Sequence, residues 1–318
     1  MKLLFLIKAS KEMENITKEI GKSKGFQVIF ENDNESWEDI EVVLTFVPAL
    51  KNIGSYINRL PNLKFIQTLS AGVDLIDFSQ IPENIMVCSN AGAFAKPVAE
   101  HAVAMAMALS KNLMANHSKM KNGVFDQSSH SMRLEGKLAG IIGYGGIGKD
   151  IGKLCKAIGM ELAVISRSPV EEQGVKYSGS LDILDRVLQE SDILFVSIPL
   201  NTYTENLITS KELDKMKADA ILVNVARADI INQKDLYEHL ISYPQFKAGI
   251  DVWWKEPINA GKFETGFGFL DLPNVIGSPH NSAMVPEIEN NAFLTALNNV
   301  ELWMKGGVPK NRVQRKDY

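Results

Sequence analysis

Short apolar runs alternate with longer helical stretches along most of this chain. The first series of runs covers residues 2–7, 25–30, 39–47, 63–69 and 85–90. The second series covers residues 138–145, 161–168, 192–199, 220–226, 246–253 and 274–280. Apolar runs of this length, separated by helical stretches, are typical of parallel strands covered by helices. The pattern therefore predicts an α/β fold with two doubly wound parallel-sheet domains.

Two helical stretches define the expected domain organisation. Residues 97–123, rich in Ala and Met, lie between the two series, and Pro97 suits the first turn of a helix. Up to about residue 113 this stretch is apolar on nearly every side, which indicates that it is buried. If it is buried against a second copy of the chain, the protein is a homodimer, and we expect one. The last helical stretch, residues 286–306, follows the second series and can return to the first domain. We expect a substrate domain from residues 1–97 plus 286–318 and a dinucleotide-binding domain from residues 98–285.

Composition narrows the classes of partner. The chain has 318 residues, of which 45% are hydrophobic and 23% charged, so it is long enough for two hydrophobic cores. Its net charge of −4 gives no broad basic surface of the kind that attracts nucleic acid or an anionic membrane. No apolar run approaches 18 residues, and the apolar start lacks a small-residue cleavage site. The only two cysteines, Cys88 and Cys155, form no CxxC pair, which favours burial and a reducing cytoplasm. We expect a small-molecule partner.

A glycine-rich segment follows the first run of the second series. Gly143, Gly145 and Gly148 satisfy GxGxxG directly after an apolar strand and directly before a helical stretch. In that setting the glycines allow a tight turn and close approach of a pyrophosphate to a helix N-terminus. The motif alone also fits an ordinary Gly-rich turn, but its place between strand and helix favours a dinucleotide site.

The next strand ends in an unusual way for such a site. Ser166 lies 23 residues beyond Gly143, where an NAD enzyme keeps a carboxylate for the ribose 2′-hydroxyl, and the chain reads Ser166, Arg167, Ser168. A guanidinium with two hydroxyl groups suits the 2′-phosphate of NADP, which a carboxylate would repel. We expect NADP, with NAD as second choice; the alternative is that Arg167 is a solvated loop residue.

Four polar residues follow later strands of the same series: Arg227, Asp251, Glu256 and His280. Each alone has a structural explanation, but ligands of doubly wound sheets bind beyond the carboxyl ends of the strands, where all four are expected. An arginine can hold a carboxylate with two hydrogen bonds. A histidine beside a glutamate can donate or accept a proton near neutral pH, because the carboxylate favours the imidazolium. The remaining histidines lack metal-ligand spacing and no metal is expected.

Motifs over most of the chain resemble those of the NAD(P)-dependent D-2-hydroxyacid dehydrogenase family, which includes glyoxylate/hydroxypyruvate reductases. They are LSAGVD (69–74), VAEH (98–101), GYGGIG (143–148), SIPLN (197–201), NVAR (224–227), KEP (255–257) and SPH (278–280). The resemblance implies a Rossmann cofactor domain inserted into a flavodoxin-like substrate domain.

The resemblance also implies residue roles. Arg227 would hold the substrate carboxylate and polarise the keto oxygen, His280 would be the acid/base, and Glu256 would orient it. The substrate carboxylate would also bind backbone N–H groups of Ala71, Gly72 and Val73. The expected cofactor contacts are Tyr144, Gly145, Gly146, Ile147, Ser166, Arg167, Ser168, Ile198, Pro199, Thr204, Val225, Ala226, Asp251, His280 and Ser282.

Departures from the family pattern bear on the substrate. Ala228 stands where the family usually has glycine, so we expect no positive φ at this position. Trp253 and Trp254 fit either the core or the pocket wall. Residues 45–47 offer no cation for a phosphate group, and formate dehydrogenases lack a Glu–His arrangement. We expect a small unphosphorylated 2-keto acid, such as glyoxylate or hydroxypyruvate, reduced with D specificity. The alternatives are a D-lactate-type or phosphorylated substrate, or a dinucleotide-sensing, corepressor-like binding protein.

Overall fold

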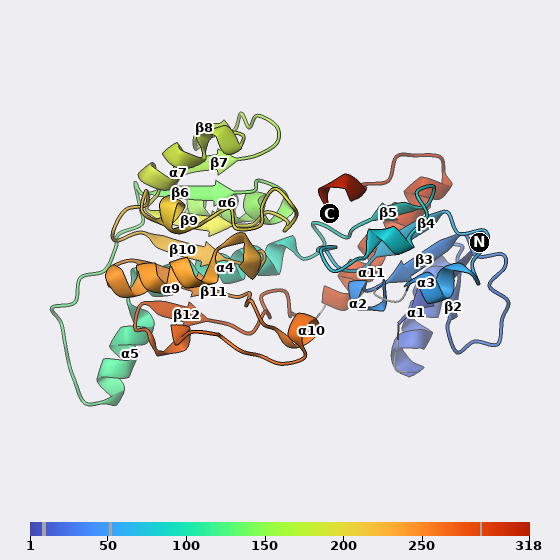
Figure 1. Ribbon diagram of the computed structural model, residues 1–318, viewed down its shortest axis with the longest axis horizontal. Coiled ribbons are helices and arrows are strands. Elements are labelled where there is room, and N and C mark those ends of the chain that lie inside the picture. The colour runs from blue at the N-terminus through green and yellow to red at the C-terminus, as the bar shows by residue number, and fades with distance from the viewer. Residues whose placement is uncertain (8–10, 51–52, 287) are drawn as a thin grey trace. The chain divides into compact units, whose positions relative to one another are not determined.

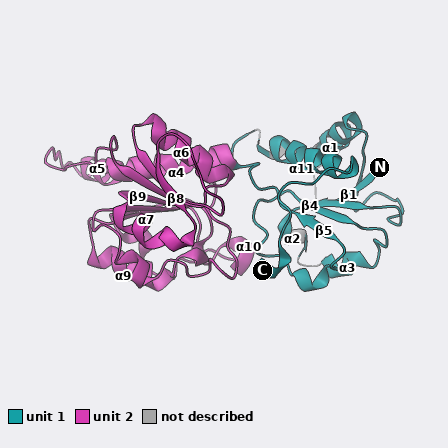
Figure 2. Ribbon diagram, turned by 90° about the horizontal axis from the view of Figure 1, so that it is seen from above, with its two compact units in different colours: residues 1–94, 285–318 teal, residues 95–284 magenta. Residues whose placement is uncertain are grey.

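The computed structural model describes residues 1–7, 11–50, 53–286 and 288–318. The chain divides into two compact units, Met1–Phe94 with Val285–Tyr318, and Ala95–Met284 (Figure 2). Both sheets are parallel throughout, so the predicted fold class of two doubly wound α/β domains is confirmed. Glu287, within the predicted last helical stretch, lies outside the described residues.

The first unit is a sheet of five strands with the order β2-β1-β3-β4-β5, the flavodoxin-like order. Its strands are β1 (Lys2–Leu6), β2 (Gln27–Phe30), β3 (Val42–Thr45), β4 (Phe65–Thr68) and β5 (Met86–Cys88). Helices α1 (Lys11–Ser23) and α11 (Ile288–Met304) lie on one face, and α2 (Val47–Leu50) and α3 (Ile53–Ile57) on the other (Figure 2). Alternate strand residues supply the two cores: Leu4 packs on the α3 side and Leu3 on the α11 side.

The second unit is a seven-stranded sheet with the order β12-β11-β10-β9-β6-β7-β8, the Rossmann order with one further strand. The strands are β6 (Leu138–Ile142), β7 (Glu161–Ile165), β8 (Val175–Gly179), β9 (Ile193–Val196), β10 (Ile221–Asn224), β11 (Lys247–Ile250) and β12 (Val275–Gly277). Helices α4 (Ala95–Ser110) and α6 (Gly146–Ala157) cover one face, and α7 (Leu184–Glu190) and α9 (Gln233–Ser242) the other (Figure 2). The shorter helices are α5 (Leu113–Lys121), α8 (Ser210–Leu213) and α10 (Pro257–Ala260).

The prediction of one helix over residues 97–123 is wrong. Two helices, α4 and α5, occupy this stretch, and the break falls at Asn112, whose φ of 52° is left-handed. Asn tolerates that conformation better than most residues, and here its side-chain amide also donates to the carbonyl of His130, 18 residues further along the chain, at 2.9 Å. Helix α4 also begins earlier, at Ala95, so that Pro97 falls in the first turn, where its missing N–H costs no hydrogen bond.

Most of the apolar surface of α4 is covered within its own unit, although Ala104 and Met107 are exposed. The predicted burial is confirmed, since residues such as Ala99, Ala102 and Ala106 are almost fully buried, and α4 packs on α6, β10 and β11. In α5 and the segment after it, by contrast, large apolar side chains are exposed, and this segment extends from the body of the unit (Figure 1). They are Leu113, Met114, Met120, Val124 and Phe125. Among the described residues, no helix is both long enough and apolar enough to span a bilayer.

Candidate active site

The three glycines after β6 meet three different needs. Gly143 has a φ of +97°, and a Cβ there would lie 2.7 Å from the Ser197 carbonyl oxygen. A Cβ on Gly148 would collide with the carbonyl oxygen of Gly143. A Cβ on Gly145 would meet nothing within 4 Å, and no side chain caps α6, which begins at the next residue. The first and third glycines thus allow the turn and the packing, while the second leaves the helix N-terminus open to a pyrophosphate.

The loop after β9 lies against this turn and is held by its own side chains. Ser197 Oγ donates to the Gly143 carbonyl at 2.8 Å, and Ile198 packs against Gly143. Thr204 is buried; its hydroxyl donates to the Pro199 carbonyl at 2.7 Å and accepts the Asn201 N–H at 2.9 Å. In this structure Thr204 therefore shapes the loop, so a cofactor contact here would fall to Ile198 and Pro199.

The segment after β7 presents Arg167 to solvent. Ser166 is half-buried, and its N–H donates to the Gly179 carbonyl of β8 at 2.8 Å, while Arg167 and Ser168 are exposed. In the described part of the chain no hydrogen bond or ion pair engages the Arg167 guanidinium. The phenol of Tyr144, by contrast, is buried and donates to Glu172 Oε2 at 2.9 Å, so only the backbone of Tyr144 belongs to the glycine turn.

Asn224, at the end of β10, fixes the turn that carries Arg227. Its Nδ2 donates to the Arg227 carbonyl at 2.9 Å, and its Oδ1 accepts the Ala226 N–H at 3.0 Å. Arg227 Nη1 donates to the Ala226 carbonyl at 2.8 Å, and the 3-10 turn Ala228–Ile230 follows. Ala228 has no positive φ, as expected for a residue other than glycine. Sequence reasoning did not assign Asn224 this role, although the residue stands within NVAR.

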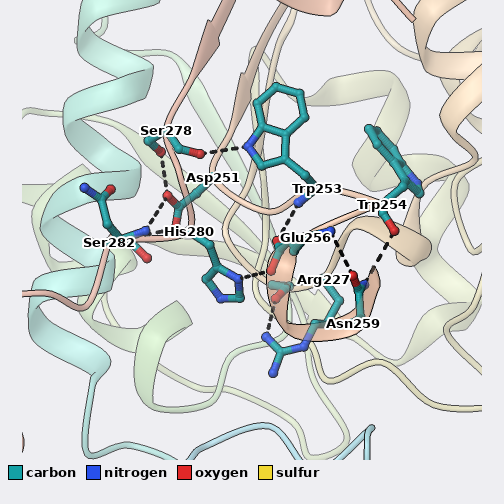
Figure 3. Close-up of polar contacts among 11 residues, drawn as sticks. Arg227, Asp251, Trp253, Trp254, Glu256, Asn259, Ser278, His280 and Ser282 are labelled. Atoms are coloured by element: carbon teal, nitrogen blue, oxygen red, sulfur yellow. Dashed lines mark hydrogen bonds and ion pairs between the residues drawn. The ribbon is translucent and has the colours of Figure 1, made fainter. Parts of the chain in front are cut away.

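Glu256 and His280 form a directly bonded pair (Figure 3). His280 Nδ1 lies 2.7 Å from Glu256 Oε2, and the other carboxylate oxygen accepts the Trp253 N–H at 2.7 Å. Glu256 is 8% exposed and begins α10, where Pro257 follows it, while the His280 side chain is 40% exposed. Because Nδ1 is engaged, Nε2 is the ring nitrogen that remains for a substrate.

The carboxylate of Glu256 is kept ionised by its neighbours. Burial alone would raise the pKa of Glu256, but the hydrogen bonds from His280 and the Trp253 N–H outweigh it and hold the pKa below its usual range. The charge of Arg227 contributes in the same direction, which places Arg227 within electrostatic reach of the pair (Figure 3). The site therefore combines a permanent anion, an imidazole and a permanent cation.

Asp251, fully buried, fixes the loop that carries His280. Its carbonyl accepts the His280 N–H at 2.8 Å, and its carboxylate accepts the Ser278 hydroxyl at 2.5 Å and the Ser282 N–H at 3.3 Å. These bonds hold His280 at a φ of 50°, a left-handed conformation that is uncommon for residues other than glycine. His101 Nε2 lies 2.9 Å from Ser278 Oγ, so this histidine, one of those without metal-ligand spacing, is linked to the same network.

Trp253 belongs to the core, and Trp254 is partly buried against it. Trp253 is 3% exposed and its Nε1 donates to the Ser278 carbonyl at 2.8 Å. Trp254 stacks on Phe269 and its Nε1 donates to the Ile231 carbonyl at 2.9 Å. Both indoles thus brace the segment between β11 and Glu256, and the Trp253 N–H orients the carboxylate directly.

The structure gathers Arg227, Asp251, Glu256 and His280 at the carboxyl ends of β10, β11 and β12, next to the backbone of Val225 and Ala226. Ala71, Gly72 and Val73 belong to the other unit, in the loop after β4. Their three successive N–H groups donate to no acceptor among the described residues. Such a run of unengaged donors suits an anionic ligand.

Comparisons with known proteins agree on one family. Residues 103–282 match the model of the D-isomer specific 2-hydroxyacid dehydrogenase NAD-binding domain. Hydroxypyruvate reductase of Thermotoga maritima is 30% identical over 89% of both chains. D-3-phosphoglycerate dehydrogenase of Archaeoglobus fulgidus is 31% identical over 81% of this chain, which spans only 48% of that relative's length. A solved structure of a proposed formate dehydrogenase from Pyrobaculum aerophilum superimposes with a TM-score of 0.86 at 28% identity, with both chains fully covered.

Proposed function

This chain belongs to the D-isomer-specific 2-hydroxyacid dehydrogenase family, and on that premise we propose that it reduces a small unphosphorylated 2-keto acid with NADPH. Membership of the family makes it an NAD(P)-dependent oxidoreductase. The corepressor-like alternative loses its support, because the chain retains an arginine and a hydrogen-bonded Glu–His pair suited to chemistry. The observation that carries the proposal is the 2.7 Å contact between His280 and Glu256 with Arg227 in electrostatic reach.

The pair is suited to move one proton at the substrate oxygen. Reduction of a keto group adds a hydride to carbon and a proton to oxygen, and a bound reduced nicotinamide supplies the hydride. In the imidazolium form, His280 holds a proton on Nε2 and donates it to the new alkoxide; in the reverse reaction neutral Nε2 accepts the proton of the hydroxyl group. Glu256 binds Nδ1–H in both states and stabilises the imidazolium by its charge.

Arg227 is proposed to hold the substrate carboxylate and to polarise the keto oxygen. A guanidinium stays charged at any working pH and offers two parallel donors to a carboxylate. The open N–H groups of Ala71, Gly72 and Val73 are proposed as further donors to that carboxylate. With the carboxylate held, the keto group is fixed relative to His280, which is the main contribution of positioning to catalysis.

The glycine turn fits a dinucleotide, and the segment after β7 favours its phosphorylated form. Gly145 leaves space at the uncapped end of α6 for a pyrophosphate. At the end of β7 no carboxylate stands among Ser166, Arg167 and Ser168, and the guanidinium is exposed. We therefore propose NADP as the preferred cofactor.

The substrate proposal rests on charge and on reaction type. At the end of β3 the residues are Thr45, Phe46 and Val47, and the Thr45 hydroxyl donates to the Leu6 carbonyl at 2.8 Å, so this segment offers no cation to a phosphate group. Oxidation of formate to CO₂ releases a hydride but no hydroxyl proton, so it gives the Glu256–His280 pair no proton to transfer. A 2-hydroxy or 2-keto acid uses both the arginine and the pair.

A homodimer is proposed on different grounds from those in the sequence. Most of helix α4 is covered within its own unit, with the large apolar side chain of Met107 exposed, whereas five large apolar side chains of residues 113–125 are exposed. An extended segment with this much apolar surface is suited to pack on a second copy.

A panel of 2-keto acids assayed with NADPH and NADH tests substrate and cofactor together through the loss of reduced-nicotinamide absorbance. Glyoxylate and hydroxypyruvate should give the highest kcat/KM, above pyruvate and above phosphohydroxypyruvate, and NADPH should exceed NADH. Highest activity with the phosphorylated acid would contradict the substrate proposal, and equal use of both cofactors would contradict the cofactor proposal.

A further inference from the structure

The loop after β7, residues 166–174, is fixed at several points although most of it is exposed. Near its start, the Ser166 N–H donates to a carbonyl of β8 at 2.8 Å. Further along, Ser178 Oγ accepts the Val170 N–H and donates to the Val170 carbonyl, at 3.1 Å each. A loop tied down in this way presents Arg167 and its serines from a defined position rather than from a flexible segment.

A carboxylate connects the same loop to the glycine turn and to α6. The Tyr144 hydroxyl, from within GYGGIG, donates to Glu172 Oε2 at 2.9 Å. Lys156 Nζ, from α6, donates to the other oxygen of Glu172 and to the Gln173 carbonyl at 3.3 Å. Hydrogen bonds from Lys156 and Tyr144 hold the pKa of Glu172 below its usual range, so these contacts persist at neutral and mildly acidic pH.

We propose that Glu172 and Tyr144 are positioning residues for cofactor choice: they hold residues 166–174 in place before the cofactor binds, so that Arg167 meets the 2′-phosphate without first being ordered. This inference rests on the proposed NADP preference. Ordering a loop on binding costs free energy that a prefixed loop avoids, so the contacts strengthen NADPH binding. Binding of NADH gains little, because it lacks the phosphate group that the loop receives.

Simple electrostatics predicts the opposite sign. Glu171 and Glu172 are neighbours in this loop, and either carboxylate repels a phosphate nearby. Glu171 is exposed, and no hydrogen bond or ion pair joins its carboxylate to the described residues. If charge alone mattered, removal of either carboxylate would strengthen NADPH binding. If Glu172 holds the loop, its removal weakens NADPH binding while removal of Glu171 does not.

The test is the Kd of NADPH and of NADH for the full chain at one fixed salt concentration, followed by quenching of tryptophan fluorescence. Glu172→Ala should raise the Kd of NADPH about three- to tenfold, the effect of losing one or two ordinary hydrogen bonds, and leave that of NADH within about twofold. Glu171→Ala, the matched control, should leave the Kd of NADPH unchanged or lower it. Tyr144→Phe should act in the same direction as Glu172→Ala but less, and Glu172→Gln, which still accepts the tyrosine bond, should recover part of the loss.

Arg167→Ala separates the failure of this inference from that of the NADP proposal. If it leaves the Kd of NADPH unchanged, the NADP proposal fails and the positioning role with it. If it weakens NADPH binding about tenfold to a hundredfold while Glu172→Ala behaves like Glu171→Ala, only the positioning role is overturned. Equal losses for NADPH and NADH in Glu172→Ala would also overturn it, since they indicate general damage to the unit. The double variant Arg167→Ala/Glu172→Ala should lose less NADPH binding free energy than the sum of the losses in the two single variants, because both residues act through one loop.

Discussion

Replacing Glu256 by glutamine tests the acid/base pair while a side chain of similar size and shape stays in place. Gln keeps an oxygen that can accept the Trp253 N–H at 2.7 Å, so the backbone contact survives while the charge beside His280 Nδ1 is lost. A hydrogen bond to a charged group contributes about 1.5–3 kcal/mol. Since the His280 side chain is 40% exposed, solvent screening places the effect at the lower end, a fall in kcat of about 10- to 30-fold.

The pH profile gives the sign of the effect. Wild-type Glu256 stays a carboxylate at any pH above its usual titration range, because its pKa is lowered. The carboxylate favours the imidazolium needed for reduction, so in Glu256→Gln the decline of kcat with rising pH should begin at a lower pH than in the wild type. His280→Ala should lower kcat by roughly two to four orders of magnitude at every pH, as expected for loss of a positioned proton donor.

Glu264→Gln is the matched control. Glu264 lies in the loop after α10 and is partly exposed, and among the described residues its carboxylate pairs only with Lys255 and Lys262. This substitution should leave both kcat and the pH profile as in the wild type. A Glu256→Gln profile that overlays that of the wild type, or an equal loss in Glu264→Gln, would refute the role assigned to the pair.

Three further outcomes are expected. Gly145→Ala should keep the wild-type Tm and weaken the binding of NADPH and of NADH equally in titrations. Gly148→Ala, whose Cβ collides with a carbonyl oxygen, should lose about 1–3 kcal/mol of unfolding free energy in urea. The reverse pattern would contradict the roles of the two glycines. Burial lowers the pKa of His239, an effect that Asp214 partly offsets, so the unfolding free energy should be highest above pH about 6.5 and fall below it. His239→Phe should narrow the difference in unfolding free energy between pH 7 and pH 5. An unchanged difference would exclude His239 as its source. Light scattering at micromolar concentration should show a dimer, which Phe125→Asp should weaken because Phe125 is 74% exposed; a monomeric wild type would contradict the proposal.

The sequence predicts the sheets well because parallel strands buried on both faces are apolar along their whole length. All five strands of the first unit, and six of the seven strands of the second unit, lie within the apolar runs from which strands were predicted. The exception is β8 (VKYSG), an edge strand with intermediate or exposed side chains and no apolar run to reveal it. The helix break at Asn112 carries a local signal, an Asn able to adopt a left-handed conformation, but the pattern of apolar residues continues through it and hides it.

The site could be predicted only for residues whose type and order along the chain indicate their chemical role. Arg227, Glu256 and His280 stand out for that reason. The residues that position them do not, because their roles depend on contacts across long stretches of chain. His101 reaches Ser278 from α4, and Tyr144 bonds to Glu172 from within a motif chosen for its glycines. Hydrogen bonds of this kind follow from the packing of the sheet and are not encoded in any local pattern.

The stereochemistry and stoichiometry of hydroxypyruvate reduction test the central claim most directly. The wild-type protein, NADPH and hydroxypyruvate are incubated together, the oxidised cofactor is counted by absorbance, and glycerate is separated by chiral chromatography. Reduction of a 2-keto acid by this site predicts one D-glycerate for each NADPH consumed, and His280→Ala should form D-glycerate at least about a hundredfold more slowly. Formation of L-glycerate, or no consumption of NADPH with either hydroxypyruvate or glyoxylate, would contradict the account.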